Sequence, residues 1–348
     1  MRGAAVALVA TLVACAPAAT GPSPSPTVKQ TFTPIPTTLP VRVLNPYALA
    51  FDAQDKLLVA DGQAGRVLRV DTRTHEVSLV AGNGTKGTSG DGGPATAAPL
   101  VFPVHVGVDA AGAVWIADVD GYRIRKVDAN GVISTVHTPT EFVYAFAFDK
   151  NGDLVFIEGN RVKKLTLATK AVTNVAGTGE KGAGGEGGAG LKAELDEPHG
   201  LTLDAAGNIF VSDTSSNRIV RIDATTGVLT RIAGGGAAGF GGDGGPATDA
   251  KLNQPRQLVF DKTGALVFAD QGNNRVRRIG ADGTIATVAG DGSALIVGDA
   301  VPALQAGMRG VWGVALNAAG DLFIASPPAA RIRAVDAKTG TIAWITAP

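Results

Sequence analysis

Two glycine-rich segments carry carboxylates in a pattern suited to ion binding. The heptapeptide GDGGPAT occurs at 90–96 and again at 242–248, and a degenerate version, GDAVPAL, begins at Gly298. Glycine lets backbone N–H groups approach an anion, and Asp91, Asp243 or Asp299 would supply oxygen ligands to calcium. No GKS or GKT follows, and tandem nonapeptides of the calcium-binding β-roll type are absent. The residues favour a turn instead, with glycine at positive φ, an Asx-type turn at the aspartate and proline at the end; calcium stays the alternative.

A second set places aromatic rings, a histidine and an arginine at one recurring position. That position follows a repeated proline or its substitute, and it is occupied by Tyr47, Val104, Tyr144, His199, Arg256 and Trp312. Aromatic rings beside an arginine suit stacking against a planar or sugar-like group, or an anion held by the guanidinium. We therefore take Tyr47, Tyr144, His199, Arg256 and Trp312 as the candidate ligand-binding residues. The alternative is that they fill the seam between neighbouring repeats.

The recurring position belongs to an internal repeat with six copies. The first apolar run of each copy is followed by one marker, and the second run ends nine residues later at another; an arginine then opens the third run. The first markers are Asp52, Asp109, Asp149, Asp204, Asp261 and Asn317. The second markers are Asp61, Asp118, Glu158, Asp213, Asp270 and Ser326. Because the second markers recur in nearly every copy, we interpret them as Asx turns and Asp–Arg hydrogen bonds that pin the hairpin loops.

Each copy holds four short runs rich in Val, Ile, Leu and Phe, separated by turn residues. Four such strands form an antiparallel meander that cannot bury both faces alone, so repeated sheets pack face to face around an axis. The first run alternates large with small residues, for example Leu49 and Phe51 against Ala48 and Ala50, which suits a crowded innermost strand. The prediction is an all-β fold: a six-bladed β-propeller of four-stranded antiparallel blades.

The repeat unit resembles the NHL family. The pattern P-x-G-[LV]-x-x-D…G-x-[LI]-[YFV]-[VIF]-[AS]-D…N-R-[IV]-x-[KR] is present as EPHGLTLDAAGNIFVSDTSSNRIVRID, from Glu197 to Asp223. The resemblance covers roughly residues 45–346 and implies a propeller. It does not imply one activity, because this fold hosts binding modules, lyases and lactonases.

The GDGGPAT segments fall between copies, after a fourth strand and before the next first strand. Degenerate versions fill two further joints, whereas the joint between copies two and three lacks the motif. Since all four connect fourth strands to first strands, we expect them to project from one face of the disc, the face that also carries the channel mouth. Loops on such a face are common recognition sites.

Catalytic chemistry is the alternative function. Related propeller lyases bind zinc through three histidines, and gluconolactonase-like propellers use carboxylates and Asn at the mouth. Of the four histidines, His105 and His199 fall on predicted inner strands, at positions of opposite parity that should point apart. The carboxylates Glu141, Asp196 and Glu197 cluster on two blades. We assign no catalytic residue and no metal ligand set, and a lactonase-like or lyase-like site at the channel mouth remains the alternative.

The N-terminus predicts export. Arg2, an apolar run from Ala4 to Ala14 and the sequence Leu-Val-Ala-Cys ending at Cys15 resemble a bacterial lipoprotein signal, in which the cysteine is acylated. The alternative is an ordinary signal peptide cut near Ala19. Residues 15–40 are rich in Pro, Thr and Ser and are predicted to be a disordered tether. The predicted organisation is therefore a signal peptide at 1–14, a tether at 15–40 and a propeller at 41–348.

Composition restricts the partners. The chain has 348 residues with 31 basic and 31 acidic side chains, so no global field attracts nucleic acid. Its single cysteine excludes an internal disulfide. We predict a lipid-anchored binding module of the outer membrane or cell surface, a monomer in contact with the membrane only through its anchor. A protein, peptide or glycan partner is expected on the face bearing the glycine-rich loops.

Overall fold

A computed structural model describes residues 43–345 of the chain. The predicted signal peptide, the Cys15 acylation site and the tether lie outside the described residues. Within residues 43–345, none of the helices has the length and apolar character that crossing a lipid bilayer requires.

The described residues form six antiparallel sheets, which confirms the predicted six-bladed β-propeller. Blade 1 consists of β1 (Pro46–Phe51), β2 (Leu57–Asp61), β3 (Arg66–Val70) and β4 (Val77–Ala81). Blade 2 consists of β5 (Pro103–Val108), β6 (Val114–Asp118), β7 (Arg123–Val127) and β8 (Ile133–His137). Blade 3 consists of β9 (Val143–Phe148), β10 (Leu154–Glu158), β11 (Arg161–Thr166) and β12 (Ala171–Ala176).

The second half of the ring repeats this order. Blade 4 consists of β13 (Pro198–Leu203), β14 (Ile209–Asp213), β15 (Arg218–Ile222) and β16 (Leu229–Gly234). Blade 5 consists of β17 (Pro255–Phe260), β18 (Leu266–Asp270), β19 (Arg275–Ile279) and β20 (Ile285–Ala289). Blade 6 consists of β22 (Gly313–Leu316), β23 (Leu322–Ser326), β24 (Arg331–Val335) and β25 (Thr341–Trp344), and β21 (Val301–Pro302) adds a fifth strand beside β25.

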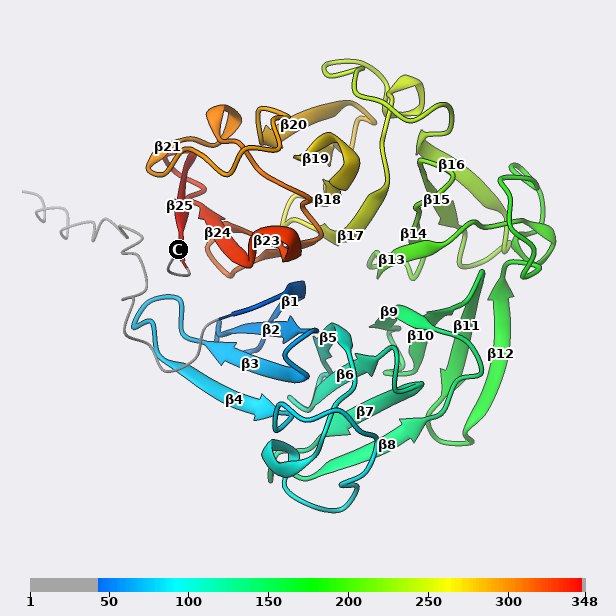
Figure 1. Cartoon of the computed structure of the whole chain (residues 1–348). Coiled ribbons are helices and arrows are strands. Elements are labelled where there is room, and N and C mark those ends of the chain that lie inside the picture. Colours follow the sequence, from blue (N-terminus) through cyan, green and yellow to red (C-terminus); the bar gives the residue numbers. More distant parts are fainter. Residues whose placement is uncertain (1–42, 346–348) are drawn as a thin grey trace, which may run out of the picture. The chain divides into compact units, whose positions relative to one another are not determined.

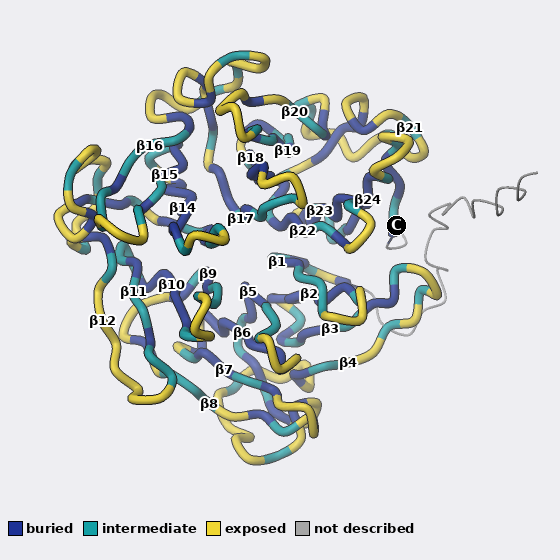
Figure 2. The backbone as a smooth tube through the Cα atoms, turned by 180° about the vertical axis from the view of Figure 1, so that it is seen from behind, coloured by how far each residue is buried: buried dark blue, intermediate teal, exposed yellow. Residues whose placement is uncertain are grey.

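The first strands line the axis. Figure 1 shows β1, β5, β9, β13 and β17 around the centre, and each first strand contacts the first strands of the neighbouring blades in a closed circuit. Figure 2 shows buried and intermediate residues along these inner strands, and exposed residues mainly in the outer loops. The second strands are buried along their whole length, because they lie between the inner strand and the third strand of a sheet that is covered on both faces.

Apolar side chains fill each seam between blades. In the seam between blades 1 and 2, Leu58 and Val67 of blade 1 pack in one cluster with Ile116 of blade 2, all fully buried. Burying each such side chain contributes roughly 1.5–3 kcal/mol. The alternation seen in the sequence places small residues where blades approach most closely. At Gly313 a Cβ atom would lie 2.7 Å from the backbone oxygen of Tyr47 in the next blade.

The two sets of markers have different roles. Five of the six first markers close an Asx turn. In blade 1, Asp52 accepts the backbone N–H groups of Gln54 and Lys56 at 3.0 and 2.9 Å. In blade 4, Asp204 accepts the N–H of Asn208 at 2.9 Å. The second markers do not form the predicted Asx turns. Instead, Asp118 accepts the N–H groups of Val101 and Phe102 at 3.0 and 2.5 Å. They thereby fix the segment that leads into the first strand, which is the segment that presents the candidate ligand residues.

Only some of the predicted Asp–Arg bonds are present. Arg66 donates to Asp61 at 3.0 Å and Arg218 donates to Asp213 at 2.7 Å. Arg275 donates instead to the carbonyl groups of Asn273 and Asp291, at 3.0 and 2.6 Å. An arginine therefore begins the third strand in every blade, but its hydrogen-bond partner is not the same in every blade.

Blades 1 and 6 close the ring by packing. One buried cluster joins Leu49, Leu57 and Leu68 of blade 1 to Phe323 and Ile332 of blade 6. The extra strand of the last sheet, β21, comes from the joint between blades 5 and 6. Val43, which precedes β1, is a buried member of the same cluster.

The glycine-rich joints run along the rim, which corrects the expectation that they project from the mouth face. In a four-stranded meander, the first strand begins on the side where the fourth strand ends. Pro94, however, pairs with Val132, which lies just before the start of β8, and Pro246 pairs likewise with Thr284 before β20. Each joint therefore passes from the mouth face down the outside of the next blade toward the opposite face, because its backbone pairs with that blade's outer edge. Figure 1 shows these joints on the outer circumference.

The return of each joint requires glycine. After the paired residues, a short 3-10 helix, η1 (Ala95–Ala97) in the first joint and η3 (Ala247–Asp249) in the fourth, packs against the preceding blade. Gly90 has φ +95°, and a Cβ there would lie 2.7 Å from the Cβ of Ala98; Gly242 has φ +88° and would meet the Cα of Ala250 at 2.7 Å. The repeated heptapeptide is thus a turn at the rim. At its first glycine the chain folds back on itself too closely for a side chain to fit.

Candidate ligand site at the channel mouth

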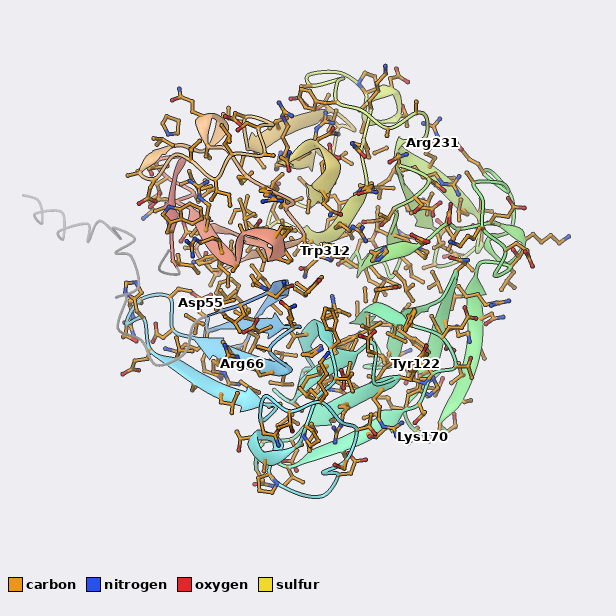
Figure 3. The ribbon with its side chains drawn as sticks, viewed as in Figure 1. Asp55, Arg66, Tyr122, Lys170, Arg231 and Trp312 are labelled. Carbon is orange, nitrogen blue, oxygen red and sulfur yellow. The ribbon has the colours of Figure 1, made fainter. Side chains whose placement is uncertain are left out.

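The five candidate ligand residues converge. Tyr47, Tyr144, His199 and Arg256 are each the second residue of an inner strand, and Trp312 directly precedes β22. The second markers hold the segments before these strands, so the five side chains start from equivalent places around the mouth. Figure 3 places Trp312 near the middle of the ring of blades. The remaining residue of this position, Val104, is buried in an apolar cluster between blades 2 and 3.

Their rings form a continuous chain across the axis. Trp312 contacts Tyr47 edge to face, with ring centroids 4.9 Å apart, and contacts His199 with centroids 5.9 Å apart. His199 in turn lies 4.1 Å from Tyr144. Because Trp312 and His199 come from blades 6 and 4, which are not neighbours, their contact spans the mouth. Such ring pairs contribute roughly 0.5–1.5 kcal/mol each beyond the area that they bury.

Three further aromatic residues extend this surface and were missed in the sequence. Phe102 lies 5.2 Å from Tyr47, Phe142 lies 6.1 Å from Tyr144, and Tyr122 stacks on Phe142 at 5.2 Å. Tyr122 and Phe142 are 40% and 39% exposed. Phe102 and Phe142 directly precede the inner strand, and Tyr122 lies in the turn after a second strand, which reaches the same face. The position directly before each inner strand could therefore have identified Phe102 and Phe142 from the sequence.

Arg256 is a buried cation without an ion pair. It is 8% exposed, and its guanidinium carbon lies 4.0 Å from the centre of the Trp312 ring. Its Nε donates to Oε1 of Gln271 at 2.5 Å, while its buried Nη1 has no hydrogen-bond partner. Burial lowers the pKa of Arg256 to about 10, which leaves the group charged at neutral pH.

His199 is neutral in this site. Burial, followed by repulsion from Arg256, lowers the pKa of His199 to about 3. The Nδ1 atom lies 2.7 Å from the backbone oxygen of Glu197 and must therefore donate to it. In the neutral ring this leaves Nε2 as an acceptor. Burial also raises the pKa values of Tyr47 and Tyr144, so both phenols keep their protons.

The other catalytic candidates do not converge on the mouth. His105 is buried and lies 3.0 Å from the backbone oxygen of Phe146, so it faces the seam with blade 3 and away from His199, as its parity predicted. Glu141 pairs with Arg161 at 3.3 Å, and Glu197 pairs with Lys181 at 2.7 Å. Among residues 43–345, no group of three or more His, Cys, Asp or Glu side chains is arranged to hold a metal ion.

The calcium candidates bind protein groups at the rim. Asp91 pairs with Arg125 at 2.6 Å and Asp243 pairs with Arg277 at 2.6 Å, and both arginine side chains are fully buried. Asp299 accepts the backbone N–H of Trp344 at 2.9 Å. These contacts tie each joint to the following blade.

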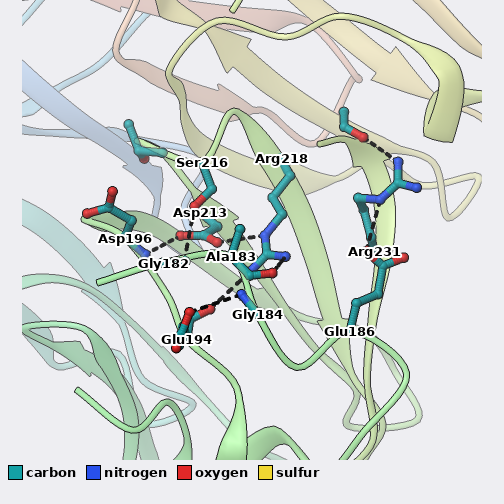
Figure 4. A network of polar contacts seen from close by, with 12 residues as sticks. Gly182, Ala183, Gly184, Glu186, Glu194, Asp196, Asp213, Ser216, Arg218 and Arg231 are labelled. Atoms are coloured by element: carbon teal, nitrogen blue, oxygen red, sulfur yellow. Dashed lines mark hydrogen bonds and ion pairs between the residues drawn. The ribbon is translucent and has the colours of Figure 1, made fainter. Parts of the chain in front are cut away.

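The third joint, between blades 3 and 4, is also tied to the following blade by an ion pair, but its arginine stands at a different position. Glu186 occupies the place of Asp91 and pairs with Arg231 of the fourth strand at 3.1 Å. Arg231 is paired in register with Val220, whereas blade 5 has Thr287 opposite Arg277. Figure 4 shows this network, in which Arg218 also donates to the carbonyl groups of Ala183 and Glu194. In each of these three joints, an acidic side chain pairs with an arginine of the following blade. The arginine lies on the third strand in blades 2 and 5 and on the fourth strand in blade 4.

A hollow of about 970 Å³ lies between blades 4 and 5 at the opposite face. Phe210, Phe260 and Leu266 contribute its apolar lining, together with the fourth joint. Its main acids already have protein partners: Asp204 accepts from Asn208 at 2.7 Å and Asp261 accepts from Arg278 at 2.8 Å. The mouth, by contrast, holds an unpartnered charge, and we therefore take it as the candidate site.

Comparisons with known proteins agree with the repeat. The model of the teneurin NHL domain matches residues 41–147, and that of the NHL repeat matches residues 195–222. Teneurin-3 from Danio rerio is 27% identical over an alignment of 286 positions that covers 67% of this chain and 10% of that protein. The chloroplastic protein SUPPRESSOR OF QUENCHING 1 from Arabidopsis thaliana is 26% identical over 275 residues, which cover 70% of this chain and 26% of that protein. The chain thus spans a minor part of the length of these relatives.

Solved structures share the fold. An auxiliary nutrient binding protein from Bacteroides thetaiotaomicron superposes with a TM-score of 0.64 at 17% identity, covering 87% of this chain and 70% of that one. Virginiamycin B lyase from Staphylococcus aureus with quinupristin superposes with a TM-score of 0.55 at 17% identity, covering 88% and 86%. The chain is thus a six-bladed β-propeller whose residues 41–147 and 195–222 match NHL-type family models.

Proposed function

We propose that this protein is an exported, lipid-anchored binding module that captures a protein, peptide or glycan partner at the channel mouth. The observation that carries the proposal is the chain of rings from Tyr47 through Trp312 and His199 to Tyr144, with Arg256 against Trp312. Aromatic rings and arginine are the residues that dominate the energetics of binding surfaces.

The route of the joints supports this position for the site. Because the glycine-rich joints descend along the rim, they do not border the mouth, and the recognition surface consists of inner-strand residues and their aromatic neighbours. Rigid strands hold these side chains, which limits the entropy lost when a ligand binds. The shared fold of a solved auxiliary nutrient binding protein also supports a binding role.

A pull-down from envelope extracts tests the proposal. The purified propeller is expected to capture a partner, and Trp312→Ala is expected to abolish the capture while the circular dichroism spectrum and melting temperature stay close to those of the parent. Trp344→Ala is the matched control, since Trp344 belongs to the outer strand β25. Equal capture by the parent and Trp312→Ala proteins would show that the mouth is not the site.

Lipid anchoring needs its own test, because Cys15 lies outside the described residues. Acylation of Cys15 in the native host is expected to incorporate a radiolabelled or alkyne-tagged fatty acid and to place the protein in the membrane fraction. Cys15→Ser is expected to lose both the label and the membrane association. Release of an unlabelled parent protein would instead support the alternative of an ordinary cleaved signal peptide.

A further inference from the structure

The mouth contains a positive charge that the protein itself leaves unsatisfied. Of the four other buried arginines, three are ion-paired: Arg125 with Asp91, Arg218 with Asp213, and Arg277 with Asp243. The fourth, Arg333 on β24, lies over the ring of Trp344 and donates to the backbone oxygen of Gly307 at 3.1 Å, away from the mouth. Arg256, which is also buried, forms no ion pair with any described residue, and its Nη1 atom has no hydrogen-bond partner. An unpaired buried charge is costly for the folded state, and an anionic ligand would compensate it.

Glu197, the carboxylate whose charge acts on Arg256, does not supply this compensation. Glu197 lowers the electrostatic cost of Arg256 from a distance. Its Oε1 atom, however, receives Lys181 at 2.7 Å, and its Oε2 atom receives Ser215 at 3.2 Å. The carboxylate is therefore committed to its own partners, and the guanidinium remains available.

The groups around Arg256 restrict the chemistry of a ligand beyond its negative charge. His199 offers an acceptor at Nε2, because its Nδ1–H already donates to Glu197. The hydroxyls of Tyr47 and Tyr144 form no hydrogen bond within the described part of the chain, so both can donate and accept. A ligand that uses all of these groups must combine a negative charge, hydroxyl groups and a ring that packs on aromatic side chains.

We propose that the mouth binds a carboxylated sugar, a uronic acid within an oligosaccharide. Its carboxylate accepts hydrogen bonds from the Arg256 guanidinium, its ring packs among Trp312, Tyr47 and Tyr144, and one of its hydroxyls donates to Nε2 of His199. A free peptide carboxylate would also meet Arg256 but carries no hydroxyl for the His199 acceptor. This inference rests on the proposed function and names the ligand class of the same site.

Isothermal titration calorimetry with a set of matched ligands tests the inference. The probes are tetra-galacturonic acid, the neutral tetrasaccharide of galactose, and an acidic tetrapeptide with a free C-terminus. The parent protein is expected to bind the uronate at least about 10-fold more tightly than the neutral sugar, since a hydrogen bond to a charged group contributes roughly 1.5–3 kcal/mol. The peptide is expected to bind more weakly than the uronate, because its carboxylate can meet Arg256 but it has no hydroxyl for Nε2 of His199.

Arg256 variants identify the charge responsible. Arg256→Gln is expected to weaken uronate binding by about 10- to 100-fold and to weaken the neutral-sugar binding by a clearly smaller factor. Arg256→Lys should recover part of the affinity, because the charge is kept and the planar fork is lost. Arg73→Gln is the matched control, as Arg73 is exposed in the turn after β3.

A stability measurement shows whether the variants fold. If the Arg256 charge is uncompensated without ligand, Arg256→Gln should melt at or above the temperature of the parent protein. A large drop in its melting temperature would mean that Arg256 serves the fold, which would overturn the inference.

The outcomes separate this inference from the proposed function. Equal affinity for uronate and neutral sugar, lost in Trp312→Ala but kept in Arg256→Gln, would overturn the carboxylate inference and leave the mouth as a binding site. If the peptide bound more tightly than the uronate, and Arg256→Gln weakened that binding, the ligand class would be a peptide and the sugar inference would be overturned. Binding of every probe that survives both Trp312→Ala and Arg256→Gln would overturn both proposals.

Discussion

The side chain of Gln257, in blade 5, hydrogen-bonds to the backbone of Leu49 in blade 1. Its Nε2 donates to the Leu49 carbonyl at 2.9 Å, and its Oε1 accepts the Leu49 N–H at 3.3 Å. The same Oε1 accepts the N–H of Val314 in blade 6 at 3.2 Å. One amide therefore links three inner strands across the point where the ring closes, and it satisfies backbone groups that face the axis.

Replacing Gln257 should weaken ring closure. Gln257→Leu keeps the approximate volume and removes the partners of three backbone groups, each of which costs up to about 1–3 kcal/mol when buried unsatisfied. We expect a loss of about 2–4 kcal/mol in the free energy of unfolding, measured by guanidinium denaturation. Gln54→Leu, in the exposed turn after β1, is the control and should stay within about 0.5 kcal/mol of the parent. A loss no larger than that of the control would mean that apolar packing alone closes the ring.

The rim ion pairs should differ in their contribution according to the burial of the arginine. Asp91→Asn leaves the fully buried Arg125 without its carboxylate and is expected to cost about 1–3 kcal/mol, because the charge stays in a dry environment. Glu186→Gln breaks a pair whose side chains are 45% and 27% exposed, and should cost no more than about 0.5 kcal/mol. Chemical denaturation of both variants gives the ranking, and the reverse order would contradict a joint-fixing role for Asp91.

Asp270 predicts a pH dependence of stability. Burial raises the pKa of Asp270 to about 6 from an ordinary value of 3.8. Between these values the folded state holds the proton more tightly than the unfolded chain, so this group's contribution to stability falls as pH rises from about 4 to about 6. Asp270→Asn lacks this penalty. The stability of the variant relative to the parent should therefore rise across that window, by on the order of 2–3 kcal/mol.

Denaturation at pH 4, 5, 6 and 7 measures the difference between the two proteins. Asp249→Asn, which changes an exposed aspartate in η3, controls for the loss of one carboxylate. A constant difference across the four pH values would show that Asp270 ionises as freely in the folded state as in the unfolded chain.

His199 should stay neutral under physiological conditions. With its pKa lowered to about 3 by burial and then by Arg256, its ring signals in NMR should not titrate between pH 8 and pH 4.5. The pKa of His199 is lowered because burial and the positive charge of Arg256 both disfavour the imidazolium form. Arg256→Gln removes the second cause and should move the titration of His199 to higher pH. A parent His199 that titrates near pH 6.5 would contradict the neutral acceptor on which the ligand assignment depends.

The repeat register could be predicted because it is local. The second strands end at the predicted residues, such as Asp61 and Asp270, and the third strands begin at the predicted arginines, such as Arg66 and Arg275. Turn chemistry and alternation along single strands fix these boundaries. The route of the joints could not be read in the same way. Glycine and proline in GDGGPAT indicate a turn, but its direction depends on pairing between Pro94 and Val132, which belong to different blades.

The candidate site was predictable only as a set of positions. One recurring position named Tyr47, Tyr144, His199, Arg256 and Trp312, because equivalent residues of a closed ring must meet around its axis. Nothing in the order of residues indicated that the guanidinium of Arg256 would lie on the Trp312 ring with its Nη1 atom unpaired. The sequence also did not show that Phe102, Tyr122 and Phe142 would extend the aromatic surface.

The sequence by itself determined the number of blades, their strands and the ring of residues at the mouth, since periodic turns and alternating side chains act within one repeat. The tertiary structure decided how the ring closes, which face the joints reach and which charges are left without partners. These features depend on contacts between blades that are far apart in the chain, such as Gln257 with Leu49. Hydrogen-bond satisfaction and desolvation are set by those contacts, and no local pattern of residues records them.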